Sequence, residues 1–193
     1  MDLDLHGKTA LVLGGGGGLG SAIATTLAGE GVNVAVADID EAALERSVQD
    51  IRQAGASGLA LTWNLADLSS IDRHVTAIEH QFGSVDILVN ITGGPPPTAA
   101  SGQDPALWIS NFQSMVLSVI AISDRVLPGM RAKKHGRIIT STSSGSLATQ
   151  ASSVDAIGSS TKPSVPVSTA RVPAGSPAAS EPGCTAGADV PSV

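Results

Sequence analysis

A run of glycines close to the N-terminus carries the clearest chemical signal in this sequence. Gly14 to Gly18 are consecutive, and Leu19 and Gly20 follow directly. Binding a dinucleotide needs a tight turn after a strand, backbone that can approach a pyrophosphate, and a helix N-terminus aimed at it. A flexible glycine linker is the alternative reading. Because an apolar run, 9–13, precedes the glycines and a helical pattern, 21–29, follows them, we predict a dinucleotide-binding turn.

A single carboxylate bears on which dinucleotide would bind. Asp38 directly follows a second apolar run, 32–37. A carboxylate at this point can accept hydrogen bonds from the adenosine ribose hydroxyls, and it would repel a 2′-phosphate. The loop 15–17 offers no Lys or Arg to hold such a phosphate. The sequence therefore favours NAD over NADP. The alternative for Asp38 is a helix-capping or solvated residue.

Short apolar runs alternate with helical patterns over the first 142 residues. Strands are expected at 9–13, 32–37, 59–63, 86–90 and 136–140, and helices at 21–29, 40–55, 69–83 and 105–132. Consecutive parallel strands need crossover connections, which are right-handed. The pattern therefore predicts an α/β fold with a doubly wound parallel sheet of the Rossmann type.

The C-terminal part of the chain differs in amino-acid composition from the rest. Residues 163–193 contain six prolines and only three charged residues, and Ser, Ala, Gly and Val make up most of the rest. Proline blocks a long helix, and this composition cannot bury much apolar surface. The sequence therefore predicts a dinucleotide-binding domain over 1–162 and a low-complexity, disordered tail over 163–193.

Composition excludes several other functions. The chain has 193 residues and a net charge of −6, which fits one domain and argues against nucleic acid or an anionic membrane as the partner. No apolar run approaches the length of a membrane span, and the N-terminus lacks the pattern of a signal peptide. The single cysteine, Cys184, excludes an internal disulfide framework. We expect a cytoplasmic protein without a metal site.

Taken together, these motifs resemble the short-chain dehydrogenase/reductase family. The segment Gly14 to Gly20 resembles the family's glycine motif, with Leu13 where threonine is usual. Asn64 and Leu65 stand where the family often has Asp and an aliphatic residue near the adenine. Residues 86–93 resemble the strand that ends in Asn-Asn-Ala-Gly. The resemblance implies cofactor contacts from Gly14, Gly16, Gly17, Gly18, Leu19, Gly20, Asp38, Asn64, Leu65, Asn90, Thr92 and Gly93.

The resemblance also implies a catalytic set, which would consist of Asn111, Ser143 and Lys162. Asn111 matches the family's helix asparagine, and Ser143 follows a segment like the strand that delivers the catalytic serine. Thr142 or Ser144 could hold the serine position instead, and Asn111 could be an ordinary surface residue. Lys162 ends a segment resembling Tyr-x-x-x-Lys, and an exposed lysine is its alternative reading.

The proton donor of that catalytic set is missing. Reducing a ketone builds negative charge on its oxygen, so a positioned acid must donate a proton. In the family a tyrosine does so, but this chain contains no tyrosine. By two ways of counting, the tyrosine position falls on Gly158 or on Ala156, and neither can donate a proton.

Two functions therefore remain open at the level of sequence. One is an NAD(P)-dependent oxidoreductase acting on a small-molecule carbonyl/alcohol pair. The other is a non-catalytic NAD-binding pseudoenzyme or truncated fragment, because the resemblance covers roughly residues 5–145 and the chain is truncated or divergent beyond them. The resemblance also implies a homo-oligomer, since family members form dimers or tetramers through the long helices near 105–132 and 150–175.

Overall fold

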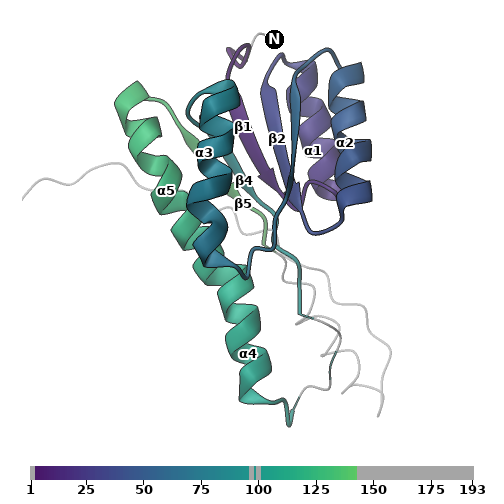
Figure 1. The fold of residues 1–193 in the computed structure, drawn as a ribbon, viewed down its shortest axis with the longest axis vertical. Helices are drawn as coiled ribbons and strands as arrows, with labels where there is room; N and C mark the ends of the chain where they lie inside the picture. The colour runs from purple at the N-terminus through teal and green to yellow at the C-terminus, as the bar shows by residue number, and fades with distance from the viewer. Residues whose placement is uncertain (1–2, 96–97, 99–100, 143–193) are drawn as a thin grey trace, which may run out of the picture. The chain divides into compact units, whose positions relative to one another are not determined.

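The computed structural model describes residues 3–95, 98 and 101–142 (Figure 1). Within these residues five strands form one parallel sheet in the order β3-β2-β1-β4-β5. The strands are β1 (Thr9–Leu13), β2 (Asn33–Asp38), β3 (Gly58–Thr62), β4 (Ile87–Asn90) and β5 (Arg137–Thr140). The predicted α/β fold with a doubly wound parallel sheet is confirmed. The predicted tail 163–193 and the domain boundary at 162 lie outside the described residues.

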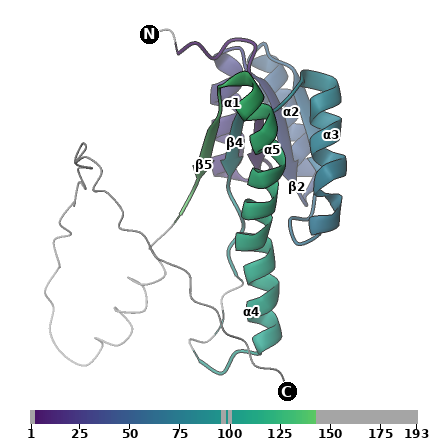
Figure 2. The ribbon, with the colours of Figure 1, turned by 90° about the vertical axis from the view of Figure 1, so that its left-hand side faces the viewer.

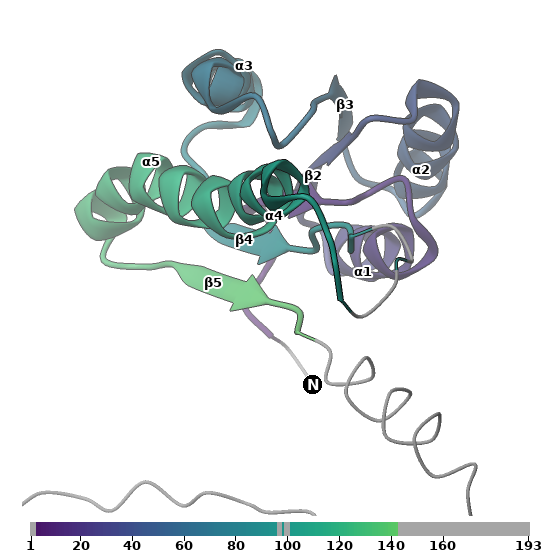
Figure 3. The ribbon, with the colours of Figure 1, turned by 90° about the horizontal axis from the view of Figure 1, so that it is seen from below.

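Helices cover both faces of the sheet (Figure 3). They are α1 (Gly18–Gly29), α2 (Glu41–Gln53), α3 (Ile71–Phe82, after the short 3₁₀ turn Leu68–Ser70), α4 (Pro105–Phe112) and α5 (Ser118–Lys133). One core contains side chains of α1 and α2, and the other contains side chains of α3 and α5. All five residues of β1 are buried, because this central strand has helices on both faces.

The boundaries of the elements agree closely with the sequence pattern. Helix α2 begins after Asp40, whose side chain accepts a hydrogen bond from the Ala43 N–H at 3.0 Å, as a capping aspartate should. Helix α1 begins at Gly18, three residues earlier than the helical pattern predicted. This early start places the end of the glycine run in the first turn of the helix.

The long C-terminal helix is continuous but not uniform. Between α4 and α5 the residues Gln113–Leu117 form a π-helical segment, so the helix runs from Pro105 to Lys133 (Figure 2). By length and composition this helix is apolar enough to cross a membrane, so the expectation that no segment reaches that length is wrong. A mostly buried core helix passes the same test, but only 11% of the most apolar stretch of this helix is buried, and the absence of a membrane partner stays a prediction.

Candidate dinucleotide-binding site

The turn between β1 and α1 has a shape that only glycine allows. Gly14 has φ +66°, and a Cβ atom added there would lie 2.5 Å from the carbonyl oxygen of Ile91. A Cβ atom on Gly20 would collide with the carbonyl oxygen of Gly14. Gly20 therefore lets the start of α1 pack against the turn, and Gly14 lets the turn pack against Ile91 after β4. A flexible linker would not require glycine at these two positions.

The N-terminus of α1 has no side chain to satisfy its free N–H groups. Its N-cap residue is Gly17, and no acidic side chain lies in its first turn. By contrast, Asp40 caps α2 and Asp104 caps α4. The first N–H groups of a helix lack partners within the helix and carry partial positive charge. The uncapped start of α1 therefore fits a phosphate group of a dinucleotide.

Asp38 closes the glycine turn from the end of β2. One carboxylate oxygen accepts a hydrogen bond from the Gly16 N–H at 3.0 Å, and the other accepts from the N–H groups of Ile39 and Asp40 at 2.8 and 3.2 Å. A carboxylate offers about four acceptor positions, so one remains for a ribose hydroxyl. The helix-capping alternative fails, because Asp40 caps α2.

Ser47 is a contact in this region that sequence reasoning missed. From α2, its hydroxyl donates to the carbonyl oxygen of Gly15 at 2.7 Å, and its side chain is buried. The available signal was a serine within the apolar stripe formed by Ala43, Leu44, Val48 and Ile51. A small polar residue on a buried helix face must bond to nearby backbone, which here is the glycine turn.

A cleft of about 380 Å³ opens at the carboxyl ends of the strands. This edge, where the connections from β1 and β4 leave toward opposite faces, is where open α/β sheets bind ligands. Seven of the predicted cofactor residues line the cleft together, namely Gly14, Gly17, Asp38, Asn64, Leu65, Thr92 and Gly93. The other five predicted residues, Gly16, Gly18, Leu19, Gly20 and Asn90, are not among its lining residues.

Asn90 lies behind the cleft and joins two strands. It is fully buried, and its side-chain amide donates to the Thr140 hydroxyl at 3.2 Å. Its side-chain oxygen is buried without a hydrogen-bond partner among the described residues. This contact ties β4 to β5, which is the structural alternative to direct cofactor binding.

Beside Asn64, an aromatic pair from the end of β3 and from α3 was not singled out from the sequence. Trp63 lines the cleft and stacks on His74 of α3, with ring centroids 4.6 Å apart and planes 24° apart. Both side chains are buried, and burial lowers the pKa of His74 below its usual value. The His74 ring thus supports Trp63 by stacking, and its lowered pKa favours the uncharged imidazole. A polar residue within the apolar face of α3 was the available signal.

The long helix presents Ser114, rather than Asn111, to this cleft. Ser114 is a lining residue, and its hydroxyl donates to the Asn111 carbonyl oxygen at 3.2 Å. The side chain of Asn111 donates to the Leu107 carbonyl oxygen at 2.8 Å and lines a separate apolar pocket. The structure therefore does not bring Asn111 together with the predicted cofactor residues. Ser143, Ser144 and Lys162 lie outside the described residues, as do Ala156 and Gly158.

Comparison with known proteins gives consistent matches. The family model for short chain dehydrogenases matches residues 8–165. The 3-oxoacyl-(acyl-carrier-protein) reductase of Escherichia coli (strain K12) is 37% identical over 139 residues, which cover 72% of this chain and 55% of that protein. The 2,3-dihydro-2,3-dihydroxybenzoate dehydrogenase of Bacillus subtilis (strain 168) is 31% identical over 70% of this chain and 52% of that protein.

Solved structures with the same fold include two oxidoreductases in complex with cofactor and ligand. A 7α-hydroxysteroid dehydrogenase complexed with NADH and 7-oxo glycochenodeoxycholic acid is 32% identical, with a TM-score of 0.69 over 74% of this chain and 55% of that chain. The L-sorbose reductase of Gluconobacter frateurii, complexed with NADPH and L-sorbose, is 26% identical, with a TM-score of 0.71 over 77% and 57%. The chain spans about half the length of the curated relatives it matches.

Proposed function

Since this chain belongs to the short-chain dehydrogenase family, we propose that it is an NAD-dependent oxidoreductase acting on a small-molecule carbonyl/alcohol pair. One observation carries the proposal: a glycine-only turn leads into the uncapped N-terminus of α1, with the Asp38 carboxylate beside it. This arrangement suits a pyrophosphate next to a ribose.

We assign each part of the dinucleotide to residues at or beside the cleft. The first-turn N–H groups of α1 and the glycine turn, Gly14 to Gly20, would hold the pyrophosphate. Asp38 would accept from the adenosine ribose, and Asn64 and Leu65 would flank the adenine. Thr92 and Gly93, which line the cleft after β4, would hold the nicotinamide end, and Asn90 ties that strand end to β5. When bound, the cofactor supplies or accepts the hydride.

NAD is the preferred cofactor in this proposal. Asp38 would repel a 2′-phosphate, and no Lys or Arg is among the described residues that line the cleft. Related structures contain either form, since the hydroxysteroid dehydrogenase holds NADH and the L-sorbose reductase holds NADPH. The preference therefore depends on the side chains at the end of β2.

The proposed catalytic set of this chain is incomplete. Asn111, Ser143 and Lys162 stay the proposed catalytic residues, and no tyrosine is present to donate the proton. Loss of a general acid lowers a rate by about 10²–10⁴-fold. Turnover should therefore be slow, with water replacing the acid. The missing tyrosine also favours a second candidate, a protein that binds NAD without turning over substrate.

The remaining expectations concern partners and location. We propose a cytoplasmic protein that binds no nucleic acid and no membrane, consistent with its net charge of −6. We also propose a homo-oligomer. After α4, the long helix exposes Leu117 and Ile120, and burying them against a second copy would remove apolar surface from water.

Thermal unfolding with NAD and with NADP tests the cofactor site directly. NAD at 100 times its dissociation constant should stabilise the fold by about 2.7 kcal/mol, and NADP should do so less. Asp38→Ala should weaken NAD binding by about ten-fold or more, since a hydrogen bond to a charged group contributes about 1.5–3 kcal/mol. Asp40→Ala is the matched control, because it removes a helix cap and should lower stability without changing NAD affinity.

Two outcomes would contradict the proposal. A cooperative unfolding transition that neither nucleotide raises would mean that the cleft does not bind a dinucleotide. NAD binding without any NADH production, over a panel of alcohols and at high protein concentration, would favour the non-catalytic alternative. Slow NADH production that disappears in Ser143→Ala would support the oxidoreductase.

A further inference from the structure

A second pocket lies on α4, and nothing in the proposed cofactor site uses it. Its volume is about 270 Å³. We call it the α4 pocket. Its lining residues are Pro95, Thr98, Gln103, Leu107, Trp108, Asn111, Phe112, Met115 and Val116. Most are apolar, and none of these described lining residues is charged.

The α4 pocket adjoins the cofactor cleft along two segments of chain. After β4, Gly94 lines the cleft and the next residue, Pro95, lines the α4 pocket. On the long helix, Ser114 lines the cleft and the next residue, Met115, lines the α4 pocket. On both segments, residues adjacent in the chain thus line the two pockets. The shared boundary is at the Thr92–Gly94 side of the cleft, where the nicotinamide is proposed to lie.

The chemistry of the α4 pocket favours a neutral ligand. Trp108 and Phe112 are 66% and 54% exposed, so a ligand placed against these two rings would remove apolar surface from water. A carboxylate in the same place would lose hydration without gaining a cationic partner. Asn111 uses one amide N–H on the Leu107 carbonyl and has a second one to offer a ligand oxygen.

We propose that the α4 pocket binds the apolar ring or chain of an uncharged ketone or alcohol, whose reacting carbon then faces the nicotinamide end of the cleft. The inference rests on the proposed oxidoreductase function and adds a substrate class to it. Substrates that carry a carboxylate on the apolar part should bind this pocket more weakly.

The two tryptophans allow the two sites to be followed separately. Trp63 lines the cofactor cleft and Trp108 lines the α4 pocket, and the chain has no tyrosine. In the full chain, the Trp63→Phe variant therefore keeps Trp108 as its only strong fluorophore, and the Trp108→Phe variant keeps Trp63. The probes are cyclohexanone and 4-oxocyclohexanecarboxylate, which share a ring and differ in charge, both added with saturating NAD.

We expect cyclohexanone to change the Trp108 emission of the Trp63→Phe variant in a saturable way, and the carboxylate to bind at least ten-fold more weakly. Phe112→Asp, added to that variant, should abolish the response. Ile109→Asp is the matched control, because Ile109 is also an exposed apolar residue of α4 but does not line the pocket. It should leave the response unchanged.

Three outcomes would overturn the inference. One is a linear, unsaturable response to cyclohexanone, and another is equal binding of the two probes. The third is Trp108 emission that depends on protein concentration and ignores the ketone, which would place a second copy of the chain on α4. In the Trp108→Phe variant, Trp63 emission reports NAD binding independently. If Trp63 emission responds to NAD but Trp108 emission does not respond to cyclohexanone, only the proposed substrate class is wrong. If Trp63 emission does not respond to NAD, the proposed function itself is wrong.

Discussion

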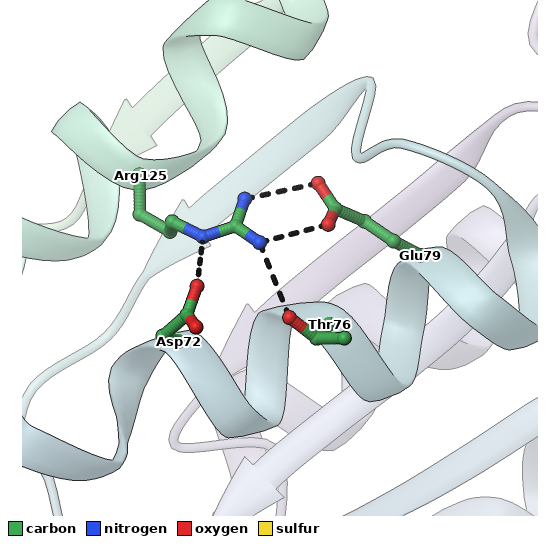
Figure 4. Close-up of polar contacts among 4 residues, drawn as sticks. All are labelled: Asp72, Thr76, Glu79 and Arg125. Carbon is green, nitrogen blue, oxygen red and sulfur yellow. Dashed lines mark hydrogen bonds and ion pairs between the residues drawn. The ribbon is translucent and has the colours of Figure 1, made fainter.

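Arg125 on α5 forms a bidentate ion pair with Glu79 on α3 (Figure 4). Its two terminal nitrogens donate to the two carboxylate oxygens at 3.0 and 2.8 Å, and its Nε donates to Asp72 at 2.7 Å. These bonds raise the pKa of Arg125 above its usual value, so the guanidinium stays charged. The contact fixes the long helix against α3 and thereby positions the helix segment that lines the cleft.

Arg125→Lys should lower the free energy of unfolding by about 1 kcal/mol. A lysine keeps the charge but cannot donate to both oxygens of Glu79 while also reaching Asp72, and partly exposed pairs of this kind contribute about that much. Urea denaturation measures the effect. Arg52→Lys, at an exposed position on α2, is the control and should change stability little. Equal stability of the two variants would mean that the ion pair does not hold the helices together.

Gly18→Ala tests whether glycine at this position is needed for NAD binding rather than for folding. A Cβ atom at Gly18 would have no neighbour within 4 Å, so the variant should fold with equal or greater stability. If backbone at this position approaches the pyrophosphate, the added methyl should weaken NAD binding about ten-fold, or ~1.4 kcal/mol. Calorimetric titration with NAD measures it.

Gly29→Ala provides the comparison for that experiment. Gly29 ends the same helix, and a Cβ atom there would also have open space. The variant should bind NAD like the unchanged protein. Equal NAD affinity of the Gly18 and Gly29 variants would remove Gly18 from the cofactor site.

The positions of the strands and the glycine turn follow from local patterns in the sequence. After Thr9, β1 is apolar because both of its faces are buried, and Asp40 precedes α2 because a free helix end needs an acceptor. Such rules act over a few residues, so a single sequence reveals them. Asp38 was identified in the same way, by its position directly after a buried strand.

Contacts between distant segments could not be predicted in that way. Ser47 reaches Gly15, and Trp63 stacks on His74, only because the crossovers bring α2 and α3 against the sheet. Asn111 was assigned from a family motif alone. Its side chain donates to the Leu107 carbonyl oxygen, and Ser114, within the π-helical segment, lines the cleft.

The stability of the fold should depend on pH through His74. Burial lowers the pKa of His74 from its usual 6.5, and the nearby charge of Arg73 adds to this while Asp67 opposes it. The unfolded chain therefore binds a proton more readily, so this contribution is complete above about pH 6.5 and is lost as the pH falls through and below that value. Urea denaturation across about pH 7.5 to about pH 5.5 measures the slope.

Replacing His74 shows how much of the pH dependence of the free energy of unfolding comes from its imidazole. His74→Phe keeps a ring against Trp63 and should flatten the pH dependence in this range. His80→Gln removes an exposed histidine from the same helix and should leave the slope unchanged. If the slope in His74→Phe equals that of the unchanged protein, the pH dependence has another source.

Gln113 should affect cofactor binding from outside the cleft. Its side-chain amide donates to the Ala66 carbonyl oxygen at 2.7 Å, joining the start of the π-helical segment to the loop that carries Asn64 and Leu65. Gln113→Met keeps the length of the side chain and loses this bond, which should cost about 1 kcal/mol of stability. Because the loop lines the adenine end of the proposed site, NAD affinity should also fall several-fold. Calorimetric titration with NAD measures that change.

Gln81→Met tests whether that loss is specific. Gln81 is exposed on α3 and does not line the cleft, so its variant should bind NAD normally. Addition of adenosine monophosphate alone should show the same loss for Gln113→Met, because the affected wall is the adenine end. A variant that is less stable but binds both nucleotides normally would limit Gln113 to holding the fold together.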